Sequence, residues 1–447
     1  MNIGAIFEVE ITSLGISGEG IGVKEGLTVF VEGALPLEKV QVRLKELKKN
    51  YAIATLLQII KPSPYRVKPP CPFFERCGGC QIMHLDYPRQ LEIKGRRVRD
   101  ALTRIGQQEV KDPVKVHPST PHFSYRNKIQ LPVAADATGQ LQVGLYAKGT
   151  HEVIPIDKCL IHMPLGDEVY RQVLKLLQRS SLKPYCERTH DGEFRHLLIR
   201  TATFAGQVLI ALVTKGAITE ELQKVAKQIS QIPQVVGVVH HRNARKDNVI
   251  LDKDFSLLYG TAFMEERLCG LTFHVSIASF FQVNPYQAEN LYQKALDLAE
   301  LTPASRVLDA YCGIGTLSLL IAKRAGFVEG IECVQQAIID AKENAKRNSI
   351  NNVNFICGVS EKAIAGINLV DRVFLNPPRK GCDPRVLLEI KRLNPPLVIY
   401  ISCDPATLAR DIQILSGYGF EVEHVEAFDM FPQTMHVETI VKLKKIL

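Results

Sequence analysis

The first sixty residues alternate apolar and polar positions with a period of two, which is the pattern of half-buried strands. The alternation covers residues 7–12, 27–31, 38–44 and 52–57. Glycine-rich turns and Pro36 separate these runs. Short strands at this spacing predict a small closed barrel over residues 1–62, of the OB-like class. Such barrels often bind single-stranded nucleic acid through a basic face. The basic residues on or beside it are Lys45, Lys48, Lys49 and Arg66.

The hydrophobic pattern changes twice further along the chain. Residues 195–260 combine apolar strands with one amphipathic helix at 219–232, which predicts a small α+β unit. After residue 304, short apolar strands alternate with helical stretches, which predicts a doubly wound α/β sheet. Its strands are expected at 305–309, 327–332, 353–357, 372–376, 398–402, 420–425 and 438–443. The sequence therefore predicts an α/β multidomain protein.

Composition places this protein in an ordinary soluble class. Of its 447 residues, 46% are hydrophobic and 23% are charged. No apolar run reaches the ~18 residues that a membrane span needs, and the first residues lack the basic-then-apolar pattern of a signal peptide. We therefore expect a cytoplasmic protein with no membrane partner. The net charge of +8 permits a polyanionic partner such as RNA.

Cysteine spacing gives the first chemical prediction, because eleven cysteines in such a chain favour metal binding or catalysis over disulfides. Cys71, Cys77 and Cys80 follow the spacing C-x5-C-x2-C, and Cys159 is the best candidate for a fourth ligand. Four thiolates bind either zinc or an iron–sulfur cluster. Zinc sites more often pair two C-x2-C turns, so one compact triplet with a distant cysteine favours a [4Fe–4S] cluster. We expect a structural or RNA-contacting role for it.

A glycine turn marks the predicted cofactor site. The segment from Asp309 to Gly315 (Asp-Ala-Tyr-Cys-Gly-Ile-Gly) joins a strand to a helix, where backbone can approach a ligand. Glu332 ends the next strand, where a carboxylate can hold ribose hydroxyls. The third glycine of the dinucleotide fingerprint is missing, and an acidic residue precedes the turn. Both features favour S-adenosylmethionine over NAD, since the sulfonium and ammonium groups of that cofactor are cationic.

Three later segments supply reactive groups at strand ends. Asn376 begins a rigid Asn-Pro-Pro turn beside the expected adenosine side of the cleft. Cys403 ends the apolar run 398–402 and should face the crevice that open α/β sheets form there. A thiolate at that place is a candidate nucleophile. His436 and Glu438 lie at the start of the last strand, although an exposed glutamate there is usually only solvated.

The expected RNA contacts come from the middle of the chain. Tyr125-Arg126-Asn-Lys128 combines an aromatic ring with cations, so it can stack a base and hold a phosphate. Phe280 or Phe281 could hold a nucleotide that leaves its stack. The arginine-rich stretch at residues 94–104 is interpreted as a solvated helix.

Together these residues resemble the RNA (uracil-5-)-methyltransferase family, in particular the iron–sulfur branch that includes the 23S ribosomal RNA enzyme. The matching segments, in family order, are Ser279-Phe-Phe-Gln282-Val-Asn284, Asp309-Ala-Tyr-Cys-Gly-Ile-Gly315, Gly330-Ile-Glu332, Ser402-Cys403-x-Pro-x-Thr-Leu-x-Arg410-Asp411 and His436-Val-Glu438. The resemblance covers nearly the whole chain. It implies a TRAM barrel at 1–62, a cluster segment at 63–90 with Cys159, a central RNA-binding domain at 91–268, and a Rossmann-like methyltransferase domain at 269–447.

The resemblance also assigns roles to single residues. It implies that Gln282, Tyr311, Glu332 and Asn376 contact S-adenosylmethionine. It implies that Cys403 attacks C6 of a uridine and that Glu438 removes the C5 proton. The cluster ligands would be Cys71, Cys77, Cys80 and Cys159. A monomer that modifies RNA, with 23S ribosomal RNA as the preferred target, is therefore expected.

Two residues depart from the family pattern. Asn376 stands where the family usually has Asp, which removes a carboxylate from the cofactor cleft. Asp404 replaces the usual Asn after the nucleophile, and a carboxylate beside a thiol raises its pKa. Three alternatives therefore stay open: the same reaction on the T-loop uridine of transfer RNA, an RNA-binding iron–sulfur protein with a weakened transferase site, and methylation of an exocyclic amine. The third is disfavoured because Arg379 stands where that motif needs an aromatic residue.

Overall fold

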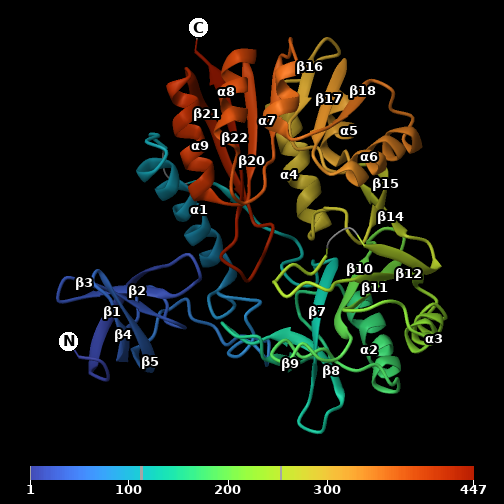
Figure 1. The fold of residues 1–447 in the computed structure, drawn as a ribbon. Helices are drawn as coiled ribbons and strands as arrows, with labels where there is room; N and C mark the ends of the chain where they lie inside the picture. The colour runs from blue at the N-terminus through green and yellow to red at the C-terminus, as the bar shows by residue number, and fades with distance from the viewer. Residues whose placement is uncertain (1, 111–113, 252–253, 447) are drawn as a thin grey trace.

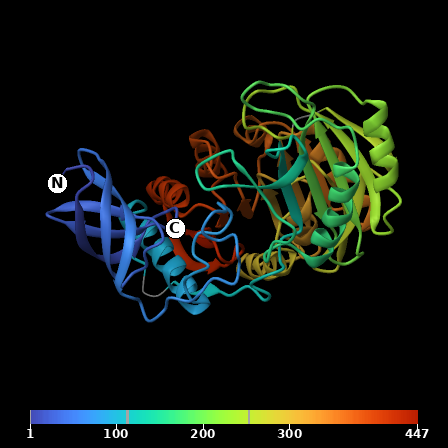
Figure 2. The same cartoon turned by 90° about the horizontal axis from the view of Figure 1, so that it is seen from below.

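The computed structural model describes residues 2–110, 114–251 and 254–446. The chain forms three folded parts, a closed barrel, a central sheet and a carboxyl-terminal sheet, which confirms the predicted fold class (Figure 1). Seen from below, the barrel stands at one end of the molecule, away from the central sheet (Figure 2). Among the helices of these ranges, none is both long enough and apolar enough to cross a membrane.

The amino-terminal barrel closes in the order β1-β2-β3-β5-β4. Its strands are β1 (Ile6–Leu14), β2 (Gly20–Lys24), β3 (Leu27–Val31), β4 (Lys39–Leu47) and β5 (Tyr51–Lys61). The period-two pattern turns Val9, Val29 and Val42 inward to fill the barrel. Glu38 is buried at one end, where its carboxylate pairs with Arg66 at 2.6 Å. This ion pair joins the barrel to the cysteine-bearing segment that follows.

The central sheet has the order β13-β12-β11-β10-β7-β8-β9. Its strands are β7 (Lys128–Ala135), β8 (Leu141–Tyr146), β9 (Val153–Pro155), β10 (Phe194–Thr201), β11 (Val208–Thr214), β12 (Val235–Arg242) and β13 (Phe255–Gly260). On one face, residues such as Ile199 and Leu212 share a core with α2 (Pro164–Gln178) and α3 (Glu220–Ile229). On the other, Leu198 and Ala211 share a core with the carboxyl-terminal part. Both faces are covered, so every residue of β10 and β11 is buried, and the apolar sequence of β11 does not alternate with polar residues.

The carboxyl-terminal sheet has the order β18-β17-β16-β19-β20-β22-β21-β6. Its strands after residue 300 are β16 (Arg306–Asp309), β17 (Phe327–Glu332), β18 (Val353–Cys357), β19 (Arg372–Leu375), β20 (Leu397–Ser402), β21 (Phe420–Phe428) and β22 (Glu438–Lys445). Strands β16 to β20 are parallel, and β22 is antiparallel to β20 and to β21. A hairpin of β14 (Phe263–Leu268) and β15 (Leu271–Ser276) precedes this sheet.

Helices cover both faces of this sheet. Val307, Phe374 and Ile399 face a core with α4 (Pro285–Leu298), α5 (Thr316–Ala322) and α6 (Gln335–Arg347). Leu308 and Val398 face the opposite core, to which four helices after residue 359 belong. These are α8 (Pro384–Leu393) and α9 (Pro405–Gly417), with the short α7 (Ser360–Ala363) and η1 (Ile364–Gly366). This arrangement is the doubly wound sheet that the sequence predicts.

One predicted boundary differs from the structure. Residues from 91 were expected to belong to the central domain, but α1 (Tyr87–Arg104) and β6 (Val116–His117) lie on the carboxyl-terminal sheet. Val98 and Leu102 of α1 share a buried core with Leu408 of α9. Strand β6 pairs with β21 at the sheet's edge. The apolar stripe of α1 determines this packing, which its many arginines concealed in the sequence.

Candidate active site

The carboxyl ends of four neighbouring parallel strands bring together side chains that lie far apart in the sequence. Strands β17, β16, β19 and β20 are adjacent in the sheet. Glu332 ends β17, Tyr311 follows β16, Asn376 follows β19 and Cys403 follows β20. Each of these four side chains is partly exposed. The four side chains therefore lie along one carboxyl edge of the sheet, where open α/β sheets bind their ligands.

Strand pairing sets Cys403 against Glu438. In the antiparallel pair β20 and β22, Ser402 is the partner of Thr439. Continuing this register by one residue places Cys403 opposite Glu438, and directly opposed residues have Cβ atoms about 4.5–5.5 Å apart. The Glu438 side chain is buried and Cys403 is half-buried. A thiol and a carboxyl group therefore lie side by side at the carboxyl end of β20.

Burial keeps both of these groups in their neutral forms. The pKa of Cys403 is raised to about 11, first by burial and then by the charge of Glu438. The pKa of Glu438 is raised to about 8, also by burial. Arg379 lowers the pKa of both groups. At pH 7 the free protein therefore holds a thiol and a mostly protonated carboxyl group, and added positive charge would ionise them.

Cations and an imidazole surround this pair. An Arg379 guanidinium nitrogen lies 3.5 Å from Nε2 of His436. Burial, followed by the charges of Arg379, Arg97 and Lys94, lowers the pKa of His436 to about 4. The ring of His436 is therefore neutral at pH 7. Arg97 and Lys94 come from α1, so the predicted solvated helix in fact borders the site.

The glycine turn after β16 leaves its backbone open on one side. Gly313 has a φ of +54°, and no atom lies within 4 Å of the position that a Cβ would take. Gly315 also has positive φ (+81°), but a Cβ there would stand 2.9 Å from Phe355. The first glycine thus leaves space for a ligand, whereas the second permits close packing of the turn against β18.

Asp309 closes this turn instead of facing a ligand. Its carboxylate accepts a 2.7 Å hydrogen bond from Ser318 of α5, and it is 1% exposed. Burial raises the pKa of Asp309 to about 6. Glu332, in contrast, is partly exposed and accepts a hydrogen bond from the backbone N–H of Val334. Of these two carboxylates, that of Glu332 is the one available to a ligand.

Gln282 is connected to the site by Tyr292, a residue that the sequence did not single out. Gln282 is buried, and its side chain hydrogen-bonds the hydroxyl of Tyr292. Burial raises the pKa of Tyr292, which also lies near Glu438 and Asp309. In the sequence, Tyr292 is one aromatic among several on an amphipathic helix, so no signal distinguished it from the core.

Asp404, one of the two departures from the family pattern, begins a helix. Its side chain accepts hydrogen bonds from the backbone N–H groups of Ala406 and Thr407, both at 3.0 Å. These bonds cap the amino terminus of α9. Asp404 also contributes to the raised pKa of Cys403. The residue after the thiol thus fixes the strand-to-helix turn.

The predicted RNA-binding residues divide into two groups. Arg126 and Lys128 are partly exposed, and burial near Arg200 and Arg126 lowers the pKa of Lys128 to about 7. Tyr125, however, is 0% exposed, and its hydroxyl donates to the carbonyl of Pro432 at 3.0 Å. Phe281 is 3% exposed and packs in the core. Neither ring offers a face to a base, so the stacking role predicted for them is corrected.

The Ser-Phe-Phe-Gln segment places its other aromatic ring outward. Phe280 is 70% exposed, next to the buried Phe281. Of the two neighbouring phenylalanines, the sequence pattern alone could not tell which faces solvent. Phe280 is therefore the ring of this pair that remains available to a nucleotide.

The four predicted cluster cysteines line one cavity. Cys71, Cys77, Cys80 and Cys159 surround a space of about 180 Å³, together with Arg126 and other side chains. Burial raises the pKa of Cys80, and the other three thiols add to the rise. Within the described ranges, no three His, Cys, Asp or Glu side chains form a group that could hold a metal ion. The thiols thus share a cavity without converging on one point.

Sequence comparisons find similar proteins along nearly the whole chain. The family model described as tRNA (Uracil-5-)-methyltransferase matches residues 86–446, and that of the TRAM domain matches residues 2–57. An uncharacterized RNA methyltransferase of Clostridium tetani is 39% identical over 441 residues, which cover 97% of this chain and 95% of that protein. One of Listeria innocua is 40% identical over 441 residues, which cover 98% and 97%.

A solved structure matches along the whole chain. The crystal structure of Pyrococcus abyssi tRNA (uracil-54, C5)-methyltransferase in complex with S-adenosyl-L-homocysteine superposes with a TM-score of 0.80. The two sequences are 27% identical, and the match covers 98% of this chain and 99% of that one. The likeness therefore includes the barrel, the central sheet and the carboxyl-terminal sheet together.

Proposed function

Since this chain belongs to the tRNA (uracil-5-)-methyltransferase family, we propose that it methylates C5 of a uridine in RNA, with S-adenosylmethionine as the methyl donor. One observation carries the proposal: the register of β20 and β22 sets the Cys403 thiol against the Glu438 carboxyl group at the carboxyl edge of the sheet. A nucleophile and a base side by side are what this reaction needs.

The residues around the glycine turn fit the methyl donor. The open backbone at Gly313 can approach it closely, and Glu332 is available to accept hydrogen bonds from ribose hydroxyls. Tyr311 and Asn376 follow the neighbouring strands β16 and β19, and Gln282 hydrogen-bonds Tyr292 near Glu438 and Asp309. These three residues would complete the site. When bound, the donor supplies an electrophilic methyl group and a positive charge. That charge would lower the pKa of both Cys403 and Glu438, in the same direction as Arg379.

Uracil C5 needs activation before it can accept a methyl group. In the proposed reaction the Cys403 thiolate adds to C6, which places negative charge on the C5–C4–O4 enolate. C5 then attacks the methyl group. The Glu438 carboxylate accepts the C5 proton, the double bond between C5 and C6 forms again, and the bond between C6 and sulfur breaks. The thiolate is released, so each catalytic group returns to its starting state after the proton leaves.

Release of the C5 hydrogen tests the reaction directly. We expect RNA labelled with tritium at uridine C5 to release tritium to water when S-adenosylmethionine is present. One tritium atom should be released for each methyl group that the RNA gains. Cys403→Ala should reduce both to background. Cys186→Ala is the matched control, because Cys186 is an exposed cysteine of the central domain. Methyl transfer without tritium release would exclude C5 as the acceptor.

Two RNA targets are proposed, each from a different observation. The resemblance to the iron–sulfur branch favours a uridine of 23S ribosomal RNA. The whole-length likeness to the Pyrococcus abyssi enzyme favours uridine 54 of transfer RNA. Unmodified transcripts of both RNAs, offered together to the protein, should differ in methyl incorporation. Mapping of the methylated nucleotide by mass spectrometry then identifies the target.

We also propose that the four-cysteine cavity holds a [4Fe–4S] cluster. A zinc ion needs its four sulfurs at about 2.3 Å from one point, whereas these thiols line a cavity of about 180 Å³. Such a cavity fits a multi-atom cluster better than a single ion. Protein purified without oxygen should contain iron and sulfide in equal amounts, and Cys80→Ala should lose both. Zinc in place of iron would contradict this assignment.

The active form is proposed to be a single chain in the cytoplasm, where ribosomal and transfer RNA are found. The proposed catalytic and cofactor-binding side chains all belong to one chain, which supports a single-chain active form. Sedimentation of the protein with and without RNA tests the assembly. A dimer as the active species would contradict this part of the proposal.

A further inference from the structure

The segment between β21 and β22 leads directly into Glu438, and we call residues 429–437 the base loop. Connections usually run over the surface, where water satisfies their backbone groups. Here Phe431 and His436 are partly exposed, and the other side chains of the loop are buried. Its polar groups must therefore find partners within the protein.

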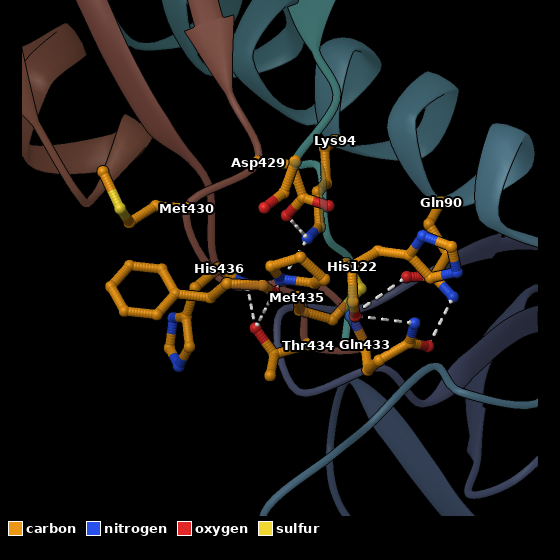
Figure 3. A network of polar contacts seen from close by, with 12 residues as sticks. Gln90, Lys94, His122, Asp429, Met430, Gln433, Thr434, Met435 and His436 are labelled. Atoms are coloured by element: carbon orange, nitrogen blue, oxygen red, sulfur yellow. Dashed lines mark hydrogen bonds and ion pairs between the residues drawn. The ribbon is translucent and has the colours of Figure 1, made fainter. Parts of the chain in front are cut away.

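A buried ion pair holds the start of the base loop. The ammonium group of Lys94 lies 2.5 Å from the carboxylate of Asp429, and both side chains are 0% exposed. Lys94 also donates to the carbonyl of Phe431 at 3.2 Å. Figure 3 shows Lys94 reaching from α1 to this end of the loop. Buried charges are tolerated when both are paired, and removing one partner is strongly unfavourable.

A second contact holds the middle of the base loop. The side-chain amide of Gln90 donates to Oε1 of Gln433 at 3.0 Å, and the backbone N–H of Gln433 donates back to Oε1 of Gln90 at 3.2 Å (Figure 3). The carbonyl of Gln433 accepts hydrogen bonds from the backbone N–H groups of Gln81 and Ile82, just after Cys80. Gln433 has a φ of +71°, which residues other than glycine rarely adopt without such support.

Three further side chains bind carbonyl groups of the same loop. Arg97 of α1 donates to Met435 at 2.6 Å, and Tyr125 donates to Pro432 at 3.0 Å. The amide of Asn284 donates to the carbonyl of Met430 at 3.2 Å. The base loop is thus held at successive positions by α1, by the cysteine segment and by the residues that begin the central sheet and α4.

We propose that α1 positions the catalytic base, with Lys94, Asp429, Gln90 and Gln433 as the positioning residues. The inference rests on the proposed function, in which Glu438 acts after methyl transfer. A base must be held within a small distance of the proton that it removes, and a displacement of about 1 Å can cost about 100-fold in rate. Glu438 is the first residue after the base loop, so the position of the loop determines the position of its carboxylate.

A misplaced base has a signature that general destabilisation lacks. The first half of the reaction uses Cys403 and the methyl donor, and it ends with a methylated nucleotide bonded to Cys403. The second half needs Glu438 to accept the C5 proton while the bond between C6 and sulfur breaks. A displaced Glu438 therefore leaves the covalent protein–RNA adduct in place. A poorly folded protein loses adduct and product in proportion.

Two variants loosen the base loop without leaving a buried charge. Gln433→Gly removes the side-chain contact with Gln90, and glycine adopts the positive φ without strain. Lys94→Met combined with Asp429→Leu removes both members of the ion pair together, which buried pairs tolerate better than loss of one partner. Glu38→Gln is the control, because Glu38 is a buried carboxylate paired with Arg66 in the barrel.

The experiment measures adduct and product on ordinary uridine RNA, with Glu438→Gln as the reference. Both loop variants should turn over about 10- to 100-fold more slowly and accumulate an adduct that survives denaturing electrophoresis. Glu38→Gln should show a wild-type ratio of adduct to product. Loop variants with unchanged turnover, or slower turnover without adduct, would overturn the positioning role. Absence of adduct in Glu438→Gln would instead overturn the proposed function and this inference with it.

Discussion

At the scale of single residues, the surroundings of Cys403 oppose the charge state that the proposed reaction needs. Attack on C6 needs a thiolate, whereas burial and the neighbouring carboxylate favour the thiol. The nearby Arg379 lowers the pKa of both groups, and a cationic methyl donor would act in the same direction. In the proposed reaction, the thiol would therefore stay neutral in the free protein and ionise when the cationic donor binds.

Glu438→Gln should lower the pKa of the Cys403 thiol in the free protein. The carboxylate is ionised above pH of about 8, and its charge raises the pKa of the thiol. Removing that charge favours the thiolate at any pH where the carboxylate would be ionised. The rate of Cys403 alkylation by iodoacetamide, followed against pH, measures the effect. Arg379→Ala should shift the profile in the opposite direction, and equal profiles would contradict the electrostatic coupling.

Decay of the covalent adduct should become faster as the pH rises. Glu438 must be a carboxylate to accept the C5 proton, and its pKa in the free protein is about 8. The ionised fraction, and with it the rate of the second half-reaction, increases with pH and levels off above the pKa that Glu438 has in the adduct. Single-turnover experiments between about pH 6 and about pH 9 measure this rate. A rate that falls with rising pH would require a different base.

Single residues show where sequence reasoning succeeded and where it failed. Cys403 was predictable because a cysteine after an apolar run must lie at a strand end. Its contact with Glu438 depends on the register between strands, which no local pattern reveals. Tyr125 and Phe281 were misjudged because an aromatic beside polar residues has the same sequence signature whether it faces solvent or the core.

At the scale of elements, Asp404 shows that a departure from the family pattern has a structural use. The side chain caps α9 with two hydrogen bonds to backbone N–H groups. Asp404→Ala should therefore destabilise the protein by about 0.5–2 kcal/mol in urea unfolding. Asp404→Asn should keep most of this stability, because asparagine also caps helices well, while it lowers the pKa of Cys403. Equal destabilisation by both substitutions would contradict the capping role.

Helix α1 is the element that sequence reasoning judged least well. Its arginines suggested a solvated surface helix, and its buried stripe of Val98 and Leu102 was not recognised. Lys94 lies on the same buried side, where a lysine is rarely found without a partner. That partner, Asp429, lies far along the chain. The contacts of α1 with the base loop could therefore come only from the three-dimensional structure.

At the scale of the molecule, the barrel stands at one end, away from the central sheet (Figure 2). Lys45, Lys48 and Lys49 lie exposed on or beside β4. If these lysines bind phosphates, the combined Lys45→Glu and Lys49→Glu variant should bind RNA more weakly. On single-stranded RNA, the logarithm of affinity decreases with the logarithm of salt concentration. The magnitude of this slope should fall by about 0.7 for each phosphate that the variant no longer neutralises. An unchanged slope in filter-binding or anisotropy titrations would place the RNA elsewhere.

The three-part organisation was predictable because each part has its own periodicity. Alternation indicated the barrel, and apolar strands separated by helices indicated the doubly wound sheet. The boundary near residue 91 was not predictable, because α1 and β6 join the carboxyl-terminal sheet through contacts between residues far apart in sequence. Contacts between residues far apart in the sequence determine such boundaries, and local sequence patterns do not contain them.

The proposed chemistry depends most directly on a bond between the Cys403 sulfur and C6 of a pyrimidine. RNA containing 5-fluorouridine tests it, because fluorine at C5 cannot be removed as a proton and the adduct should persist. After digestion, mass spectrometry should find one nucleotide attached to the peptide that contains Cys403. That nucleotide should carry an added methyl group only when S-adenosylmethionine is present. No adduct, or an adduct on another cysteine, would contradict the central claim.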